Sequence, residues 1–246
     1  MQPLVSVVIP SVPGREKYLQ RAIQSVKNQT YKNIEIITVV DDTINSNQAR
    51  NRGIKLAKGD FIAFLDDDDT WHPEKIERQM QVMLRHPNIA LVTCYSRDFR
   101  YGEYVDKPPK RVTQEDVLNS LCYSSTSTYL VRKYALDMVG GFDETLPSAQ
   151  EYDLAIRLLE YHGALCIPEV LVVQNRTKNQ TSLNIKKKIK GLLMVYEKHK
   201  GRFIKASKLN PVKIYATCFI FLLSKILGRK IILAIKKFKD VKGYAW

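Results

Sequence analysis

Three short apolar runs, rich in β-branched residues and separated by helical patterns, constrain the fold of this chain most. The runs are LVSVVI at residues 4–9, Ile34 to Val40 and Phe61 to Leu65. A Pro-Gly turn and a helical pattern follow the first run, with apolar residues at Tyr18, Leu19, Ile23 and Val26. Strands that are buried on both faces give continuous apolar runs of this kind. The pattern predicts an α/β fold with a mostly parallel sheet and helices on both faces.

Two of these expected strands end in carboxylates. Asp41 and Asp42 follow the second strand, and Asp66 through Asp69 follow the third. In open parallel sheets, ligands bind in the crevice beyond the carboxyl ends of the strands. We therefore expect a binding site at this edge of the sheet.

Four consecutive aspartates repel one another, so they cost stability unless positive charge lies among them. A divalent cation would supply that charge. Oxygen ligands without a nearby His or Cys pair favour Mg²⁺ or Mn²⁺, whose open positions accept phosphate oxygens. The alternative is that Asp69 and Thr70, with Pro73, cap a helix near residues 73–86. Capping accounts for one or two of the four aspartates, so we favour the metal and phosphate interpretation.

The charge of the chain is concentrated near its C-terminal end. The net charge is +14, and residues 185–246 hold 17 Lys or Arg against two acidic residues, a net charge of +15. The first 184 residues therefore carry −1. This asymmetry predicts a near-neutral body at 1–184 and a basic tail at 185–246.

Composition excludes several other classes of protein. With 45% hydrophobic residues, the chain is not disordered throughout. Its 4 cysteines show no C-x-x-C spacing, so we expect neither a zinc site nor a disulfide framework. Scattered cysteines are typical of a reducing compartment. The apolar N-terminal run lacks the basic segment of a signal peptide. We therefore expect a cytoplasmic protein.

The basic tail is expected to form amphipathic helices on the inner face of the cell membrane. Its longest uncharged run, Ile214 to Ser224, has 11 residues, whereas a spanning helix needs about 20. Mixed apolar and basic side chains suit an anionic bilayer surface. The expected membrane contacts are Lys213, Phe219, Phe221, Lys225, Arg229 and Lys230. The alternative is that these helices pack on the body with solvated lysine faces. Nucleic acid is disfavoured because the aromatic residues are not interleaved with the basic ones.

Several strings, in order and with ordinary spacing, resemble the family 2 glycosyltransferases, which bind nucleotide diphosphate sugars and have the GT-A fold. The strings are VSVVIP, QTYKNIEIITVVDD, ARNRGIKLAKGDFIAFLDDDDTWHPEKIERQ, TSTYLVRKYALDMVGGFDETL and QEYDLAIRL. Together they cover about residues 4–176. The resemblance implies a GT-A catalytic domain at 1–184, with a nucleotide-sugar half at about 1–100 and an acceptor half at about 101–184.

The resemblance also implies which residues bind the donor and the metal ion. The donor-binding residues would be Pro10, Ser11, Asp42, Asp66 and Asp67. Asp42 would bind the base, usually uracil. The D-x-D pair, Asp66 and Asp68, would hold Mn²⁺ or Mg²⁺, with Asp68 as the direct ligand.

Glu151, within Gln150-Glu151-Tyr152-Asp153, falls where the family has its catalytic base, and Asp153 is the alternative base. Direct displacement by a hydroxyl needs a carboxylate to accept the proton and a cation to stabilise the departing diphosphate. An expected helix N-terminus at Glu151 favours the ionised carboxylate. The alternative is that Glu151 only stabilises the helix dipole, paired with Arg157 or Lys133.

On the acceptor side, the resemblance implies roles for Trp71 and Gly141. Trp71 would cover the sugar, or else be a half-buried aromatic residue beside a helix start. Gly141 lies in Gly140-Gly141-Phe142-Asp143, an expected turn before the acceptor loop, where glycines more often serve backbone geometry than ligand contact. The histidines show no metal-ligand spacing and are expected to be structural; they are His72, His86, His162 and His199.

These observations predict an inverting, metal-dependent glycosyltransferase. It would move a sugar from a nucleotide diphosphate sugar, expected to be UDP-linked, to a hydroxyl of a lipid-linked or glycan acceptor at the membrane surface. One alternative is a sugar nucleotidyltransferase of related fold, for which Pro13-Gly14-Arg15 is a faint version of the required basic loop. Another is a non-catalytic protein that binds lipid or nucleic acid through the basic tail.

Overall fold

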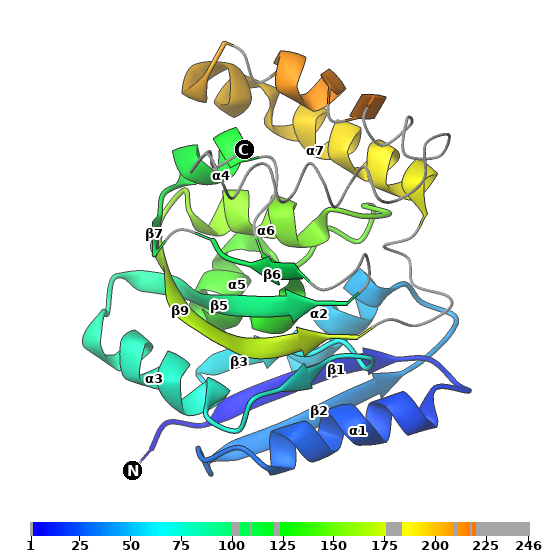
Figure 1. Ribbon diagram of the computed structural model, residues 1–246, viewed down its shortest axis with the longest axis vertical. Coiled ribbons are helices and arrows are strands. Elements are labelled where there is room, and N and C mark those ends of the chain that lie inside the picture. The colour runs from blue at the N-terminus through cyan, green and yellow to red at the C-terminus, as the bar shows by residue number, and fades with distance from the viewer. Residues whose placement is uncertain are drawn as a thin grey trace.

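A computed structural model describes residues 2–99, 104–108, 110–120, 124–175, 184–208, 211–216 and 218–219. Strands and helices alternate along most of this chain (Figure 1). In chain order, the elements are β1 (Val5–Ser11), α1 (Glu16–Lys27), β2 (Ile34–Val40), α2 (Ser46–Leu56), β3 (Phe61–Phe64), β4 (Thr70–Trp71), α3 (Lys75–Arg85), β5 (Ile89–Asp98), β6 (Tyr104–Asp106), β7 (Arg111–Val112), α4 (Gln114–Ser120), the 3-10 helix η1 (Thr126–Thr128), β8 (Leu130–Arg132), α5 (Lys133–Val139), α6 (Gln150–Leu158), β9 (Gly163–Gln174) and α7 (Ile185–Ala206).

The strands form one sheet in the order β2-β1-β3-β8-β5-β9-β4, with β6 paired to β5 and β7 to β9. β1 is parallel to both β2 and β3. β8 is antiparallel to both β3 and β5, so β5 runs in the same direction as β3, and β9 is parallel to β5. The longer strands β1, β2, β3, β5 and β9 therefore share one direction. The mostly parallel sheet expected from the sequence is confirmed, with β8 and the short strands β4, β6 and β7 as its antiparallel members.

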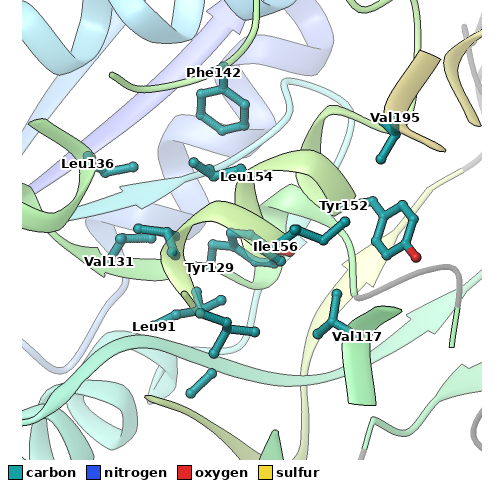
Figure 2. Packing of buried hydrophobic residues seen from close by; sticks show 14 of the residues in the cluster. Leu91, Val117, Tyr129, Val131, Leu136, Phe142, Tyr152, Leu154, Ile156 and Val195 are labelled. Atoms are coloured by element: carbon teal, nitrogen blue, oxygen red, sulfur yellow. The ribbon is translucent and has the colours of Figure 1, made fainter. Parts of the chain in front are cut away.

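Helices cover both faces of the sheet because successive side chains of each buried strand point to opposite sides. Val5, Val7 and Ile9 of β1 lie in one hydrophobic cluster with residues of α1 and α3. Val8 lies in a second cluster with residues of α2, α4, α5, α6 and α7. Figure 2 shows part of this second cluster, including Tyr152 of α6. The prediction of a sheet covered on both faces is confirmed.

The first helix of the basic tail belongs to the body. Four residues of α7 are buried in the second cluster: Leu192, Val195, Tyr196 and Phe203. Figure 1 shows α7 beside α4 and α6, at the opposite end of the molecule from α1. The alternative of helices packed on the body is therefore correct for α7, and the boundary expected at residue 184 does not separate two cores.

The rest of the tail is described only as far as residue 219. Of the expected membrane contacts, Lys213 and Phe219 are described, whereas Phe221, Lys225, Arg229 and Lys230 lie outside the described residues. Among the helices that the structure describes, none is long and apolar enough to span a bilayer.

Candidate functional site

The two aspartate-containing segments expected from the sequence, one after β2 and one after β3, both contact the carboxyl end of β1. Ser11 ends β1, and its carbonyl oxygen accepts a hydrogen bond from the Asp41 backbone N at 3.1 Å. The Ser11 hydroxyl donates to Oδ2 of Asp67 at 2.6 Å. The chain that follows β3 therefore lies over the end of β1, and Pro10, Ser11 and Asp67 come together. Asp42 is exposed in the loop after β2.

Arginine side chains lie among the four aspartates. Arg15, in the loop after β1, donates from Nε and Nη2 to both oxygens of Asp67, at 2.7 and 2.6 Å. The same Nη2 lies 3.3 Å from Oδ2 of Asp68. Arg50 of α2, which is buried, lies 2.5 Å from Oδ1 of Asp66. These two guanidinium groups supply part of the positive charge that we expected from a metal ion.

Asp69 accepts a hydrogen bond from the Ser127 hydroxyl at 2.6 Å and one from the Asn175 backbone N at 3.2 Å. Thr70 lies in β4, and α3 begins after Glu74, whose side chain makes no capping hydrogen bond. The alternative in which Asp69 and Thr70 cap this helix is therefore wrong. Asp69 instead joins the segment after β3 to η1 and to the end of β9.

The described residues fit a metal ion only in combination with a ligand. Among the described residues, no three His, Cys, Asp or Glu side chains lie close enough together to hold a metal ion by themselves. Mg²⁺, and Mn²⁺ in similar sites, is commonly held by one or two carboxylates together with substrate phosphates and water. Asp66 and Asp68 pair with different guanidinium groups. A cation that takes most of its ligands from phosphate oxygens and water fits this donor set, and a cation held by protein groups alone does not.

Helix α2 connects the aspartates to the loop before α6. Asn47, which lies one turn before Arg50, donates from Nδ2 to the carbonyl oxygens of Asp143 and Leu146, at 2.9 and 3.1 Å. Asn51 exchanges two hydrogen bonds with the backbone of Phe142, at 2.9 and 2.8 Å. The loop before α6 is thereby fixed to the helix that carries Arg50.

The glycine turn expected from the sequence is confirmed. Gly140 and Gly141 have φ angles of 76° and 70°, in the left-handed region. At Gly141 a Cβ atom would lie 2.5 Å from Oδ1 of Asn51. Gly141 therefore serves backbone geometry and close packing on α2, and its acceptor contact stays a prediction.

Glu151 lies in the first turn of α6, as expected, and is partly exposed. The helix follows Ala149, a non-glycine residue with φ of 62°. The two cations that the helix-dipole alternative gives to Glu151 are engaged elsewhere. Arg157 pairs with Asp153 at 2.6 Å, and Lys133 pairs with Asp137 at 2.9 Å.

Asp153, the alternative base, has no exposed surface. Its carboxylate lies 2.6 Å from Nη2 of Arg157, 3.0 Å from Nζ of Lys198 and 2.8 Å from Nε2 of His199. Burial by itself would raise the pKa of Asp153, but the hydrogen bond with His199 and the charge of Arg157 outweigh it, so the pKa lies well below its usual range. The carboxylate anchors α7 to α6, and an acceptor hydroxyl would not reach it. Of the two candidate bases, Glu151 is the one with exposed surface, and its role as the base stays a prediction.

Trp71 is an interior residue. Its side chain lies in the cluster of α1 and α3, and its Nε1 donates to the Ser127 carbonyl oxygen at 2.9 Å. Lys75, also buried, places Nζ 3.9 Å from the centre of the indole ring, and burial lowers the pKa of Lys75 to about 7. The expectation that Trp71 covers a sugar is not supported. Trp71 is only 5% exposed, so it is more buried than the half-buried aromatic residue of the alternative.

Comparison with known proteins agrees with this geometry. The sequence model described as glycosyl transferase family 2 matches residues 6–47 and 45–137, more than half of the chain. An uncharacterized glycosyltransferase of Rickettsia typhi is 29% identical over 218 residues, which cover 74% of this chain and 68% of that protein. WcaA of Escherichia coli, named as a colanic acid biosynthesis glycosyl transferase, is 29% identical over 252 residues, covering 84% of this chain and 85% of WcaA.

Solved structures show the same fold. The mannosyltransferase PcManGT from Pyrobaculum calidifontis, in complex with GDP-Man and Mn²⁺, has a TM-score of 0.66 at 14% identity, over 98% of this chain and 81% of that chain. TarS from S. aureus, in complex with UDP-GlcNAc, has a TM-score of 0.60 at 16% identity, over 74% of this chain and 61% of the TarS chain. The fold is GT-A. With its aspartates at the ends of parallel strands and more than half of its length matched, the chain belongs to glycosyl transferase family 2.

Proposed function

We propose that the protein is an inverting, metal-dependent glycosyltransferase that moves a sugar from a nucleotide diphosphate sugar, UDP-linked by preference, to an acceptor hydroxyl. The observation that carries the proposal is the group of carboxylates that follows β3 and lies at the carboxyl end of β1, within the segment that matches the family. The nucleotide sugars bound by PcManGT and TarS support a donor of this class.

Each residue of the site has a proposed role in donor binding. Pro10 and Ser11 line the nucleotide pocket, and Asp42 binds the base from its exposed loop. Asp67 also binds the donor, and the hydrogen bond from Ser11 fixes its carboxylate. A divalent cation, when bound by Asp68 together with Asp66, would supply positive charge to the departing diphosphate.

Glu151 is the proposed base. Its place in the first turn of α6 favours the ionised carboxylate, because the helix N-terminus carries partial positive charge. The carboxylate would take the proton from the acceptor hydroxyl as the oxygen attacks the sugar from the side opposite the diphosphate. Such a one-step displacement inverts the configuration. The left-handed conformation of Ala149, two residues before Glu151, supports a functional role, because backbone strain of this kind clusters at active sites.

A thermal-shift panel tests the donor and the cation together. UDP-GlcNAc and GDP-Man, each with Mn²⁺ and with chelator, are compared with UTP and GTP. Ligand at 100 times its Kd stabilises a protein by about 2.7 kcal/mol, which raises the Tm of a domain of this size by several degrees. We expect that rise for at least one nucleotide diphosphate sugar, and only with Mn²⁺. No shift with any sugar nucleotide would contradict the proposal, and a shift with a triphosphate alone would favour a nucleotidyltransferase.

We further propose that the acceptor is a lipid-linked or glycan molecule at the membrane surface, and that the end of the described tail contacts the cytoplasmic side of the membrane. Residues 211–216 and 218–219 are helical. Val212, Tyr215 and Phe219 are 65%, 57% and 60% exposed, and their spacing places them on one side of this helical segment. Ile214 and Cys218, on the other side, are buried against the body. Lys213 lies beside the exposed apolar residues, as suits an anionic bilayer.

Co-sedimentation with vesicles tests this surface in the full chain. Replacing Tyr215 and Phe219 together by Ser should reduce binding to phosphatidylglycerol vesicles about ten-fold, because apolar burial drives insertion. The matched control is Leu84→Ser in α3, which removes an equally exposed apolar side chain, 58% exposed, far along the chain from the tail. Equal loss in both proteins, or no loss in the double variant, would contradict the proposed contact.

A further inference from the structure

Arg15 supplies positive charge to the aspartates from the loop that follows β1. It donates to both oxygens of Asp67 and lies 3.3 Å from Oδ2 of Asp68. The side chains of Asp67 and Asp68 are 8% and 12% exposed, so water screens these charges only in part. A two-pronged guanidinium–carboxylate pair is among the strong ionic contacts in proteins. Without a ligand, Arg15 therefore already offsets part of the charge of Asp67 and Asp68.

A divalent cation at Asp68 would compete with this guanidinium for the same carboxylate. Two positive charges about 4 Å apart repel each other strongly where water is partly excluded. We therefore expect Asp68 to bind a cation tightly only when Arg15 moves away from Asp68 toward another anion. The family's proposed ligand, a nucleotide diphosphate, brings such an anion into the crevice.

Arg15 is placed to make that move. Its side chain is 22% exposed, and the residue lies at the boundary of α1, outside the regular helix. The planar guanidinium that matches a carboxylate also matches a phosphate group. Its guanidinium carbon lies 5.0 Å from the centre of the Tyr18 ring, a contact that leaves the planar group in reach of the site.

The aspartates have anchors that do not depend on Arg15. The Ser11 hydroxyl donates to Asp67 at 2.6 Å. The backbone carbonyl of Asp68 accepts hydrogen bonds from Nη2 of Arg21 and Nδ2 of Asn175, at 2.7 and 3.0 Å. The segment after β3 therefore keeps its position when Arg15 leaves, and Asp68 stays at the site.

We propose that Arg15 is a displaceable counter-ion of the donor site. In the donor-free protein it offsets part of the negative charge of Asp67 and Asp68 and weakens cation binding. The donor diphosphate draws Arg15 onto its own oxygens and releases Asp68 to the cation. Cation and donor therefore bind with positive coupling, which must act equally in both directions. The inference rests on the proposed function, because it takes the ligand to be a diphosphate.

The test measures Mn²⁺ binding to the full chain by electron paramagnetic resonance, first with Mn²⁺ alone and then with UDP, or with GDP in a second series. Arg15→Gln should bind Mn²⁺ alone about ten-fold more tightly than the natural protein, because a competing positive charge is gone. The nucleotide should then raise Mn²⁺ affinity about ten-fold less in the variant than in the natural protein. Arg15→Lys, which keeps the charge but loses the two-pronged contact, should lie between them.

Arg52→Gln is the matched control. It removes a guanidinium that lies 3.4 Å from Asp41 at the same edge of the sheet, without contact to Asp67 or Asp68 among the described interactions. Both Mn²⁺ measurements should stay within about two-fold of the natural protein. Thermal unfolding checks that each variant is folded, and Arg15→Ala replaces Arg15→Gln if the latter is not.

The possible outcomes separate this inference from the proposed function. Equal affinity for Mn²⁺ alone in the natural protein and in Arg15→Gln overturns the inference, and so does the absence of Mn²⁺ binding in both. If neither UDP nor GDP binds, the proposed function fails, while the measurement with Mn²⁺ alone still decides whether Arg15 competes with the cation.

Discussion

Glu151→Gln is expected to lower the rate of sugar transfer about 1,000-fold, while the affinity for the donor stays within about two-fold. A positioned general base contributes about 10²–10⁴ to a rate, and the amide of glutamine cannot accept the acceptor's proton. The amide keeps the size of the side chain, so the shape of the site is preserved. Steady-state release of the nucleotide diphosphate gives kcat, and calorimetry gives the donor affinity.

Glu115→Gln is the matched control for this experiment. Glu115 is an exposed acidic residue in the first turn of α4, so its replacement removes the same helix-dipole interaction from a different helix. That interaction is worth about 0.3–1 kcal/mol of stability, and its loss should leave transfer unchanged. If Glu151→Gln behaved like Glu115→Gln, with a small loss of stability and full transfer, the helix-dipole alternative would be correct.

Asp153→Asn completes the comparison because it concerns the other carboxylate of the same turn. Its loss leaves Arg157 without its buried counter-charge, which typically costs about 3–5 kcal/mol of unfolding free energy, whereas Lys198 keeps its pair with Asp143. Since the pKa of Asp153 is lowered by folding, its contribution is fully present above the unfolded pKa and is lost as the pH falls below about 4. A large drop in Tm at neutral pH, which shrinks toward low pH, would identify Asp153 as a structural anchor.

The sequence predicted β1, β2 and β3 well, because strands that are buried on both faces give continuous apolar runs. β2 spans Ile34–Val40, the residues of the expected run, and β1 and β3 differ from theirs by one or two residues at the ends. β8 has only three residues, Leu130–Arg132, and a segment of this length shows no period. Its antiparallel position between β3 and β5 follows from packing, which no local pattern reveals.

The aspartates were predicted to meet at one edge, but the cations that neutralise them were not. Arg15 is 52 residues from Asp67, and Arg50 is 16 residues from Asp66. Such pairs depend on how β1, α2 and β3 lie beside one another, so charge and spacing alone do not identify them. The position of Arg15 directly after the first strand was the available signal, because that loop opens into the expected crevice.

α7 illustrates a different limit. Its lysines and apolar residues suit a membrane surface, but the same stripe of Leu192, Val195, Tyr196 and Phe203 also suits the core of a protein. Amphipathic periodicity predicts that one side of a helix is buried, but it does not identify whether a membrane or the protein core covers that side. The contacts of Lys198 and His199 with Asp153 identify the body as the partner of this helix.

Asp68→Ala is expected to lower donor turnover at least 1,000-fold with little effect on folding. Charge stabilisation by a bound cation is worth several kcal/mol in the transition state, and about 4 kcal/mol corresponds to a factor of about 1,000. The fold should tolerate the change because Arg15 keeps its two-pronged contact with Asp67. The Asp68 backbone keeps its hydrogen bonds with Arg21 and Asn175 as well.

Asp41→Ala is the control for this experiment, because Asp41 is an aspartate at the same sheet edge whose contacts are with Thr43 and Arg52. Its turnover should stay within about three-fold of the natural protein, since an exposed pair of this kind contributes little. Turnover is measured as nucleotide diphosphate release at saturating Mn²⁺, with Tm recorded for each protein. If Asp68→Ala kept turnover within ten-fold of Asp41→Ala at an unchanged Tm, the carboxylate would have no part in stabilising the departing diphosphate. The charge would then have to come from Arg15 and Arg50, the guanidinium groups already in contact with the aspartates.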